Sequence, residues 1–188
     1  MSQTDRRVKR TRLRLQEAIV ALILERPFYK ITVQHILDRA DVGRSTFYMH
    51  FPDKEALLVS TFDDLAADLD HHIGGSNGSH HPLHAKAFFL HAQEHRDFYQ
   101  AMIEGGGMEI VLETGRRHIE DGIQSHLGQM GVKEESLGVP LPALINFLTG
   151  ALLSLLTWWL AEDMPYTPTR MAEIYEQLVM PGFQSLIS

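Results

Sequence analysis

Two short apolar stretches on either side of the tripeptide Asp41-Val42-Gly43 constrain the fold of this chain more than any other feature. The first, residues 33–40, repeats apolar side chains at helical spacing over barely two turns, and Thr32 precedes it as a candidate N-cap. The second places Phe47 and Phe51 on one edge of another short helix, which a proline then ends. Two short helices joined by a glycine-containing turn have the layout of a helix-turn-helix unit, whose second helix enters a DNA major groove.

Helical spacing of apolar residues continues through the rest of the chain. Pro27 closes a helix around residues 17–24, and Asp53 can cap a longer helix that runs to about Asp70. No segment reads convincingly as a strand, so the predicted fold class is all-α. Further helices are expected over residues 85–103, 108–127 and 143–161, and from Pro168, with Thr167 as its N-cap, until Pro181.

Charge divides the chain into a basic head and an acidic body. Residues 1–54 carry 11 lysines and arginines against 6 acidic residues, whereas residues 55–188 carry a net charge of −12 within the chain total of −7. This division indicates that only the head meets a polyanion, although a solubilising charge run has the same composition. We expect a DNA-binding domain over residues 1–54 and a helical effector-binding and dimerisation domain over residues 55–188, bridged by the helix from about residue 54 to 70.

Composition excludes several kinds of chemistry. The chain has no cysteine, which removes disulfide frameworks, thiolate zinc sites and cysteine nucleophiles together. Neither a P-loop nor a dinucleotide fingerprint is present, and no cofactor is predicted. The first residues lack the continuous apolar stretch of a secretory signal, so the expected location is the cytoplasm.

The second short helix offers side chains that suit DNA. With Phe47 and Phe51 turned inward, Ser45, Thr46 and Met49 lie on the opposite face, and Arg44, Tyr48 and His50 lie at its flanks. Arginine can make a bidentate contact to guanine, hydroxyl groups can bond to base edges or phosphates, and methionine can lie against a thymine methyl. Three side chains are better placed to contact phosphates, namely those of Tyr48, His50 and Lys54.

Residues 32–58 closely resemble the DNA-binding domain of the TetR/AcrR family of transcriptional regulators, above all in the T-F-Y-x-H-F-x-x-K segment from Thr46 to Lys54. The resemblance implies a DNA-binding regulator, expected here to be a ligand-responsive repressor. Two departures are Gly43, where many members have a capping serine, and Ser45, which replaces a frequent glycine. By motif position, the family's DNA contacts fall on Thr32, Gln34, Arg44, Ser45, Thr46, Tyr48, His50 and Lys54.

A second helix of interest lies in the body, where residues 139–161 contain no charged side chain. This length qualifies as a membrane span, but prolines, Asn146, Gly150 and Ser154 interrupt the apolar run, which favours a helix covered by protein. Because this helix is apolar on nearly every side, we expect it to pair with the last helix in a homodimer interface. A dimer presents two recognition helices about 34 Å apart and therefore requires a palindromic operator.

Histidines gather between residues 71 and 95, and they suggest two alternatives to regulation by an organic ligand. In a continuous helix His80, His84, His91 and His95 would align as a metal-binding stripe, but Pro82 argues against such a helix, and no metal site is predicted. The segment His91-Ala-Gln-Glu94-His95 also matches the H-x-x-E-H pattern of a zinc peptidase. A third metal ligand has no evident source, so a non-enzymatic protein is favoured.

Aromatic and methionine side chains in the body could line an apolar effector pocket, although core packing is the commoner role for such residues. An effector that prefers one body conformation would change operator affinity through the bridging helix. The candidate ligand-binding residues are Phe89, Phe98, Met102, Phe147 and Trp158.

Overall fold

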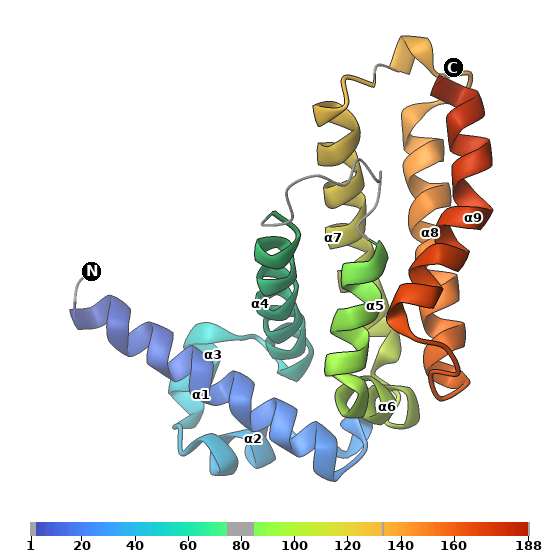
Figure 1. The fold of residues 1–188 in the computed structure, drawn as a ribbon. Helices are drawn as coiled ribbons and strands as arrows, with labels where there is room; N and C mark the ends of the chain where they lie inside the picture. The colour runs from blue at the N-terminus through green and yellow to red at the C-terminus, as the bar shows by residue number, and fades with distance from the viewer. Residues whose placement is uncertain (1–2, 75–84, 133, 188) are drawn as a thin grey trace. The chain divides into compact units, whose positions relative to one another are not determined.

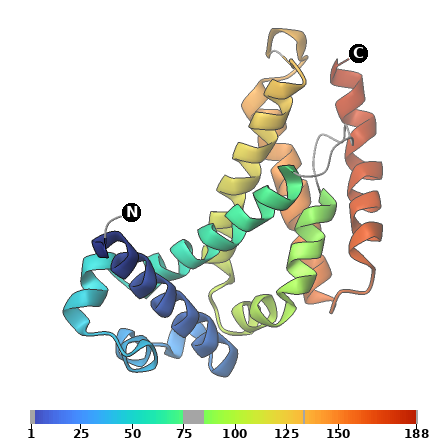
Figure 2. The ribbon, with the colours of Figure 1, turned by 60° about the vertical axis from the view of Figure 1, so that its left-hand side comes forward.

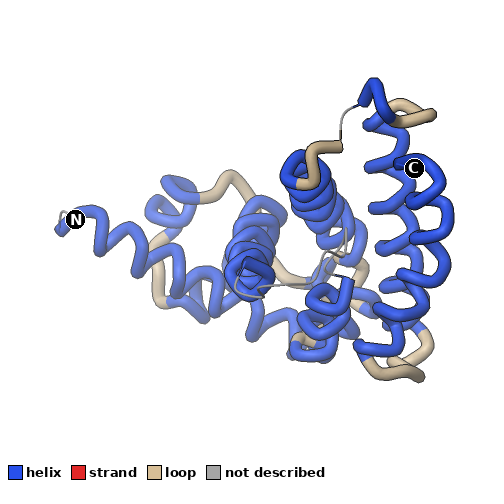
Figure 3. Tube along the Cα trace, turned by 45° about the horizontal axis from the view of Figure 1, so that its top comes forward, coloured by secondary structure: helices blue, strands red, loops and turns tan. Residues whose placement is uncertain are grey.

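The computed structural model describes residues 3–74, 85–132 and 134–187, and helices make up its regular structure (Figure 1). The predicted all-α class is confirmed, since Figure 3 draws no strand within these residues. The elements in order are α1 (Gln3–Glu25), η1 (Phe28–Lys30), α2 (Val33–Ala40), α3 (Arg44–His50), α4 (Lys54–Gly74), α5 (Ala85–Glu94), α6 (Arg96–Glu104), α7 (Met108–Gln129), η2 (Glu134–Ser136), α8 (Leu141–Ala161) and α9 (Pro168–Ile187).

The chain forms two compact units, and neither is continuous in sequence. The first contains Met1–Leu65 and Asp97–Thr114, and the second contains Ala66–Arg96 and Gly115–Ser188. The first unit therefore joins the helix-turn-helix region to α6 and the start of α7. The expected division into domains of residues 1–54 and 55–188 stays a prediction.

Three helices begin at the capping residues that the sequence predicts. The Thr32 side chain accepts a hydrogen bond from the His35 amide at 3.3 Å, and the His35 ring accepts one from the Thr32 amide. Asp53 caps α4 by accepting a bond from the Ala56 amide at 2.7 Å. Thr167 does the same for α9 by accepting a bond from the Arg170 amide.

The core of the first unit is apolar and joins helices that are distant in sequence. In Figure 2, α1 lies across α2, against which it packs. Two polar side chains on α1 also reach α4: Arg12 donates to the Ser60 hydroxyl at 2.7 Å, and Gln16 donates to the Asp64 carboxylate. Buried side chains of this core include Leu15, Ile19, Phe28, Ile36, Phe47, Phe51, Leu57, Leu58 and Phe62.

The turn between α6 and α7 is pressed against η1 within the first unit. The Tyr29 amide donates to the Gly105 carbonyl at 3.3 Å. A Cβ atom on Gly105 would lie 2.8 Å from the Phe28 nitrogen and 2.6 Å from the Ala101 carbonyl oxygen. Glycine is required here because the neighbouring backbone leaves no room for a side chain.

The second unit is built on α8 and α9, which run side by side in Figures 1 and 3. The ring of Phe89 on α5 meets the fully buried Trp159 edge to face at 5.4 Å between centroids. The Trp159 indole donates to the Tyr166 carbonyl at 2.9 Å, and the Tyr175 hydroxyl donates to the Leu148 carbonyl. Both buried polar groups are thus satisfied.

Three sequence predictions about helix limits are wrong. The helix expected around residues 17–24 begins at Gln3. The helix expected over residues 85–103 is divided at His95 into α5 and α6, because residues beyond Arg96 pack in the first unit whereas α5 packs in the second. The last helix was expected to end at Pro181 but continues to Ile187. A proline costs one backbone hydrogen bond, and burial of Val179 and Phe183 on either side of it keeps the helix intact.

The helix α8 is long and apolar enough to cross a membrane by length and composition, with a mean hydropathy of 1.6 over its most apolar window. Of that window, 44% is buried inside the protein. Core helices of soluble proteins are also this long and this apolar, so length and hydropathy do not identify α8 as a membrane span.

Candidate DNA-binding surface

The helix α3 is held by two phenylalanines and presents its other side to solvent. Phe47 is fully buried and Phe51 is 3% exposed, with 6.1 Å between their ring centroids. By contrast, Met49 is 75% exposed and Tyr48 is 50% exposed. Arg44 and Ser45 are also exposed, and Thr46 and His50 are half-buried. The predicted outward orientation of this helix is therefore confirmed.

The structure joins two of the predicted DNA-contacting residues across the turn. Arg44 on α3 donates to the Gln34 side-chain oxygen on α2 at 2.8 Å, and Gln34 donates in turn to Asp38 at 2.8 Å. All three side chains are exposed. A guanidinium group has five N–H donors, so this bond orients Arg44 and leaves donors for a base or phosphate.

Lys54 has a different position from that expected of a phosphate contact. Its ammonium donates to the Phe28 carbonyl at 2.9 Å and to the Ile31 carbonyl at 2.8 Å, and it lies 4.4 Å from the centroid of the Phe28 ring. The side chain is only 16% exposed. Lys54 thus braces the start of α4 against η1, and a phosphate contact would have to use the one remaining ammonium hydrogen.

Gly43 precedes α3 without a side-chain cap, which agrees with the departure noted in the sequence. Its φ of −72° is open to any residue. A Cβ atom there would approach only the Thr46 hydroxyl, at 4.0 Å. Neither backbone nor packing therefore requires glycine, and the space beside the start of α3 is open.

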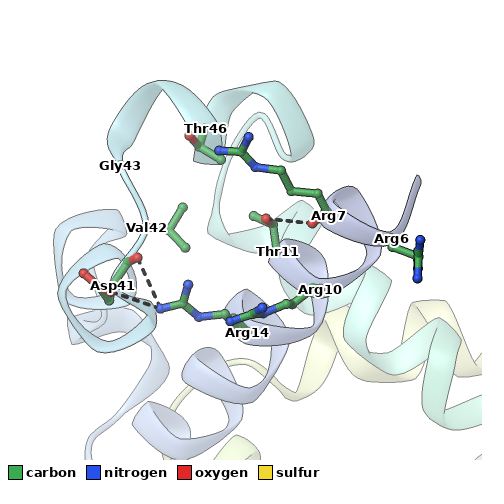
Figure 4. Close-up of a pocket in the computed structure, with 9 residues that line it drawn as sticks. All are labelled: Arg6, Arg7, Arg10, Thr11, Arg14, Asp41, Val42, Gly43 and Thr46. Carbon is green, nitrogen blue, oxygen red and sulfur yellow. Dashed lines mark hydrogen bonds and ion pairs between the residues drawn. The ribbon is translucent and has the colours of Figure 1, made fainter. Parts of the chain in front are cut away.

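A hollow of about 560 Å³ lies between α1 and this open space (Figure 4). Figure 4 shows Arg14 bonded to Asp41 and the Arg7 side chain reaching toward α3. These arginines are not among the residues predicted to contact DNA, although Arg7, Arg10 and Arg14 follow helical i, i+3, i+7 spacing. The lining residues are Arg6, Arg7, Arg10, Thr11, Arg14, Asp41, Val42, Gly43 and Thr46.

The five candidate effector-binding residues are divided between the two units. Phe98 and Met102 belong to the first unit, where Met102 is fully buried beside Gly107. Phe89 is buried against Trp159 in the second unit. The other two, Phe147 at 60% and Trp158 at 44%, are exposed on α8. Their role in binding an effector stays a prediction.

The histidine-rich segment is only partly described, since His80 and His84 lie outside the described residues. The rings of His91 and His95 are 4.6 Å apart between centroids, and Glu94 is exposed. Burial, reinforced by the neighbouring His95, lowers the pKa of His91 to about 4. Within the part of the chain that the structure describes, no three His, Asp or Glu side chains are grouped to hold a metal ion.

Two family models match most of the sequence. The model described as "Bacterial regulatory proteins, tetR family" matches residues 15–61, which include the helix-turn-helix region. The model described as "Transcriptional regulator C-terminal region" matches residues 83–181. The two matches follow the division into a DNA-binding head and a helical body that the charge pattern suggested.

Known proteins show the same relationship. The uncharacterized HTH-type transcriptional regulator YxbF of Bacillus subtilis (strain 168) is 38% identical over 72 residues, which are 38% of this chain but only 19% of that protein. A TetR transcriptional regulator from Streptococcus agalactiae 2603V has a TM-score of 0.65 and 26% identity, covering 94% of this chain and 97% of its own. The regulator FadR from Bacillus subtilis, solved with stearoyl-CoA, shares the fold with a TM-score of 0.61 at 16% identity, over 89% of this chain and 96% of its own.

Proposed function

This chain belongs to the TetR family of transcriptional regulators, and we propose that it is a ligand-responsive repressor that binds a palindromic operator as a homodimer. Members of the family are transcriptional regulators, so the zinc peptidase considered for His91, Glu94 and His95 is set aside. A repressor of this kind acts on DNA in the cytoplasm, which is the proposed location.

The observation that carries the proposal is the exposed face of α3. A seven-residue helix anchored by Phe47 and Phe51 leaves Tyr48 and Met49 projecting into solvent, with Arg44 oriented by Gln34 at its start. The Tyr48 ring meets the ring of Phe47 edge to face, and its exposed side, like the exposed Met49 side chain, suits contact with a groove. The proposed DNA-contacting set remains Thr32, Gln34, Arg44, Ser45, Thr46, Tyr48, His50 and, through its third hydrogen, Lys54.

Replacing Tyr48 by alanine tests this assignment. We expect operator affinity to fall about tenfold or more through loss of a hydrogen bond to a charged phosphate, with little change in folding. The measurement is a mobility shift with a duplex selected from a random pool by the unaltered protein. Tyr29→Ala is the matched control, because Tyr29 is a 65% exposed tyrosine of the same unit outside the predicted set. Equal affinity of the Tyr48 variant and the unaltered protein would remove α3 from the interface.

We assign the homodimer to the exposed face of α8 together with α9. Phe147 and Trp158 project from this face, and Gly150, Ala151 and Ser154 between them are small enough for a second helix to approach closely. On α9, Leu178 is 68% exposed. Two such helix pairs can form a four-helix interface about a two-fold axis, which also explains a palindromic operator.

A charge on this face is expected to separate the subunits. Phe147→Glu places a carboxylate in the proposed interface, and we expect the dissociation constant of the dimer to rise by about tenfold or more. Sedimentation equilibrium measures this constant directly. Leu90→Glu, on α5, is the control, since Leu90 is an exposed apolar residue of the same unit and does not belong to the proposed α8–α9 face. A Phe147 variant that dimerises like the control would place the interface elsewhere.

The effector is proposed to be a small molecule that binds the helical body and shifts the population of DNA-binding conformations. The candidate contacts stay predictions within each unit, with Phe98 and Met102 in the first unit and Phe89, Phe147 and Trp158 in the second. Because FadR from Bacillus subtilis was solved with stearoyl-CoA, acyl-CoA esters are suitable first compounds for a thermal-shift screen. A compound that raises the melting temperature and releases operator DNA would identify both the effector class and repression.

A further inference from the structure

The hollow beside α3 is lined by arginines whose charge is mostly unneutralised. Arg6, Arg7 and Arg10 project from the first turns of α1, and none of the three is paired with an acidic side chain among the described residues. Arg14 is the exception, since it lies 3.3 Å from the Asp41 carboxylate. Three unpaired guanidinium groups around one hollow favour an anion strongly, and arginine is suited to the oxygens of a phosphate.

We propose that this hollow seats the phosphate backbone of the DNA duplex, so that α1 forms a second DNA contact beside the recognition helix. The inference rests on the proposed function. Gly43 and Thr46 close the hollow on the side of α3, so an anion held there lies next to the start of the helix that enters the groove. When α3 docks in a major groove, the phosphates beside that groove come to lie next to the hollow.

Arg7, Arg10 and Arg14 form a row along α1, and the length of this arginine row favours binding of a polymer over binding of a single free anion. From Arg7 to Arg14 the helix advances about 10 Å at 1.5 Å per residue. Phosphates recur about every 3.4 Å of axis along one DNA strand, so the row can meet more than one of them. Free inorganic phosphate shares the chemistry of the contact but would use only part of this row.

The Asp41 carboxylate competes with a bound phosphate for the Arg14 guanidinium. It ends α2 in the left-handed conformation with φ of 51°, and its carboxylate and carbonyl oxygens both accept bonds from Arg14 at 3.3 Å. A phosphate in the hollow must share Arg14 with this carboxylate. Asparagine has nearly the same shape and tolerates the left-handed conformation, so Asp41→Asn removes the competing charge without straining the turn.

The experiment measures binding of the full chain to two duplexes, one selected from a random pool by the unaltered protein and one of random sequence, between 50 and 200 mM salt. The variants are the triple Arg6→Gln, Arg7→Gln, Arg10→Gln, the corresponding triple lysine substitution, and Asp41→Asn. Arg170→Gln is the control, because Arg170 is an arginine of the second unit that pairs with Glu173. Circular dichroism verifies helicity, and thermal shift with inorganic phosphate tests the free anion.

We expect the triple glutamine variant to bind both duplexes more weakly by a similar factor, on the order of 100-fold at 0.1 M salt, with a salt slope shallower by about 2.7. The triple lysine variant should keep the slope, and Asp41→Asn should bind more tightly with a slope steeper by about 0.9.

Unchanged slopes in the glutamine variant overturn the inference. The inference is also overturned if that variant binds both duplexes normally and loses only the stabilisation by inorganic phosphate. If the unaltered protein selects no duplex, the proposed function fails and the inference fails with it. If it binds DNA normally and only the variant slopes are unchanged, the inference alone fails.

Discussion

Replacing Phe47 by alanine is expected to lower the free energy of unfolding of the first unit by about 3–5 kcal/mol. Phe47 is fully buried, contacts the ring of Phe51 and is the main anchor that holds α3 in place. A cavity at this point cannot be filled easily, because the same core also contains Ile36 and Leu58, each fully buried. Chemical denaturation followed by circular dichroism measures the loss.

The matched control is Met49→Ala on the same helix. Met49 is 75% exposed, so its removal should leave the unfolding free energy within about 0.5 kcal/mol of that of the unaltered protein. The two variants then separate folding from DNA binding, since Met49 belongs to the surface that we propose faces the groove. If Phe47→Ala unfolded at the same denaturant concentration as Met49→Ala, α3 would not depend on its phenylalanine anchor.

Gly105→Ala is expected to destabilise the protein by about 3 kcal/mol. The added Cβ would lie 2.8 Å from the Phe28 nitrogen and 2.6 Å from the Ala101 carbonyl oxygen, and both atoms belong to the backbone. Relief therefore requires the α6–α7 turn to withdraw from η1, with loss of the hydrogen bond from the Tyr29 amide. Because η1 also receives the Lys54 bonds, we expect operator affinity to fall along with the melting temperature.

Gly122→Ala is the control of opposite sign. Gly122 lies within α7, and a Cβ atom there would meet nothing within 4 Å. Alanine is the better helix former, so this substitution should stabilise the protein by up to about 1 kcal/mol. Differential scanning calorimetry of the two variants compares the same chemical change at a crowded and an open site. A similar small shift in both would show that the α6–α7 turn does not press on η1.

Short-range patterns in the sequence were sufficient to predict the DNA-binding head. Thr32 and Asp53 cap helices through bonds to residues three positions ahead, and Phe47 and Phe51 share a face because they are four residues apart. Each of these features depends on neighbours within one or two helical turns. The exposed side chains of α3 could be predicted for the same reason.

The tertiary structure alone decided the features that join distant residues. Lys54 meets carbonyl groups 26 and 23 positions earlier in the chain, Gly105 meets Phe28, and Arg14 meets Asp41. The break at His95 likewise reflects which unit each side packs in, since helical periodicity runs through it unchanged. Local spacing specifies which face of a helix is apolar, but it contains no information on which distant backbone that face will meet. Packing supplied this information, and with it the structural role of Lys54 and the arginine hollow beside the recognition helix.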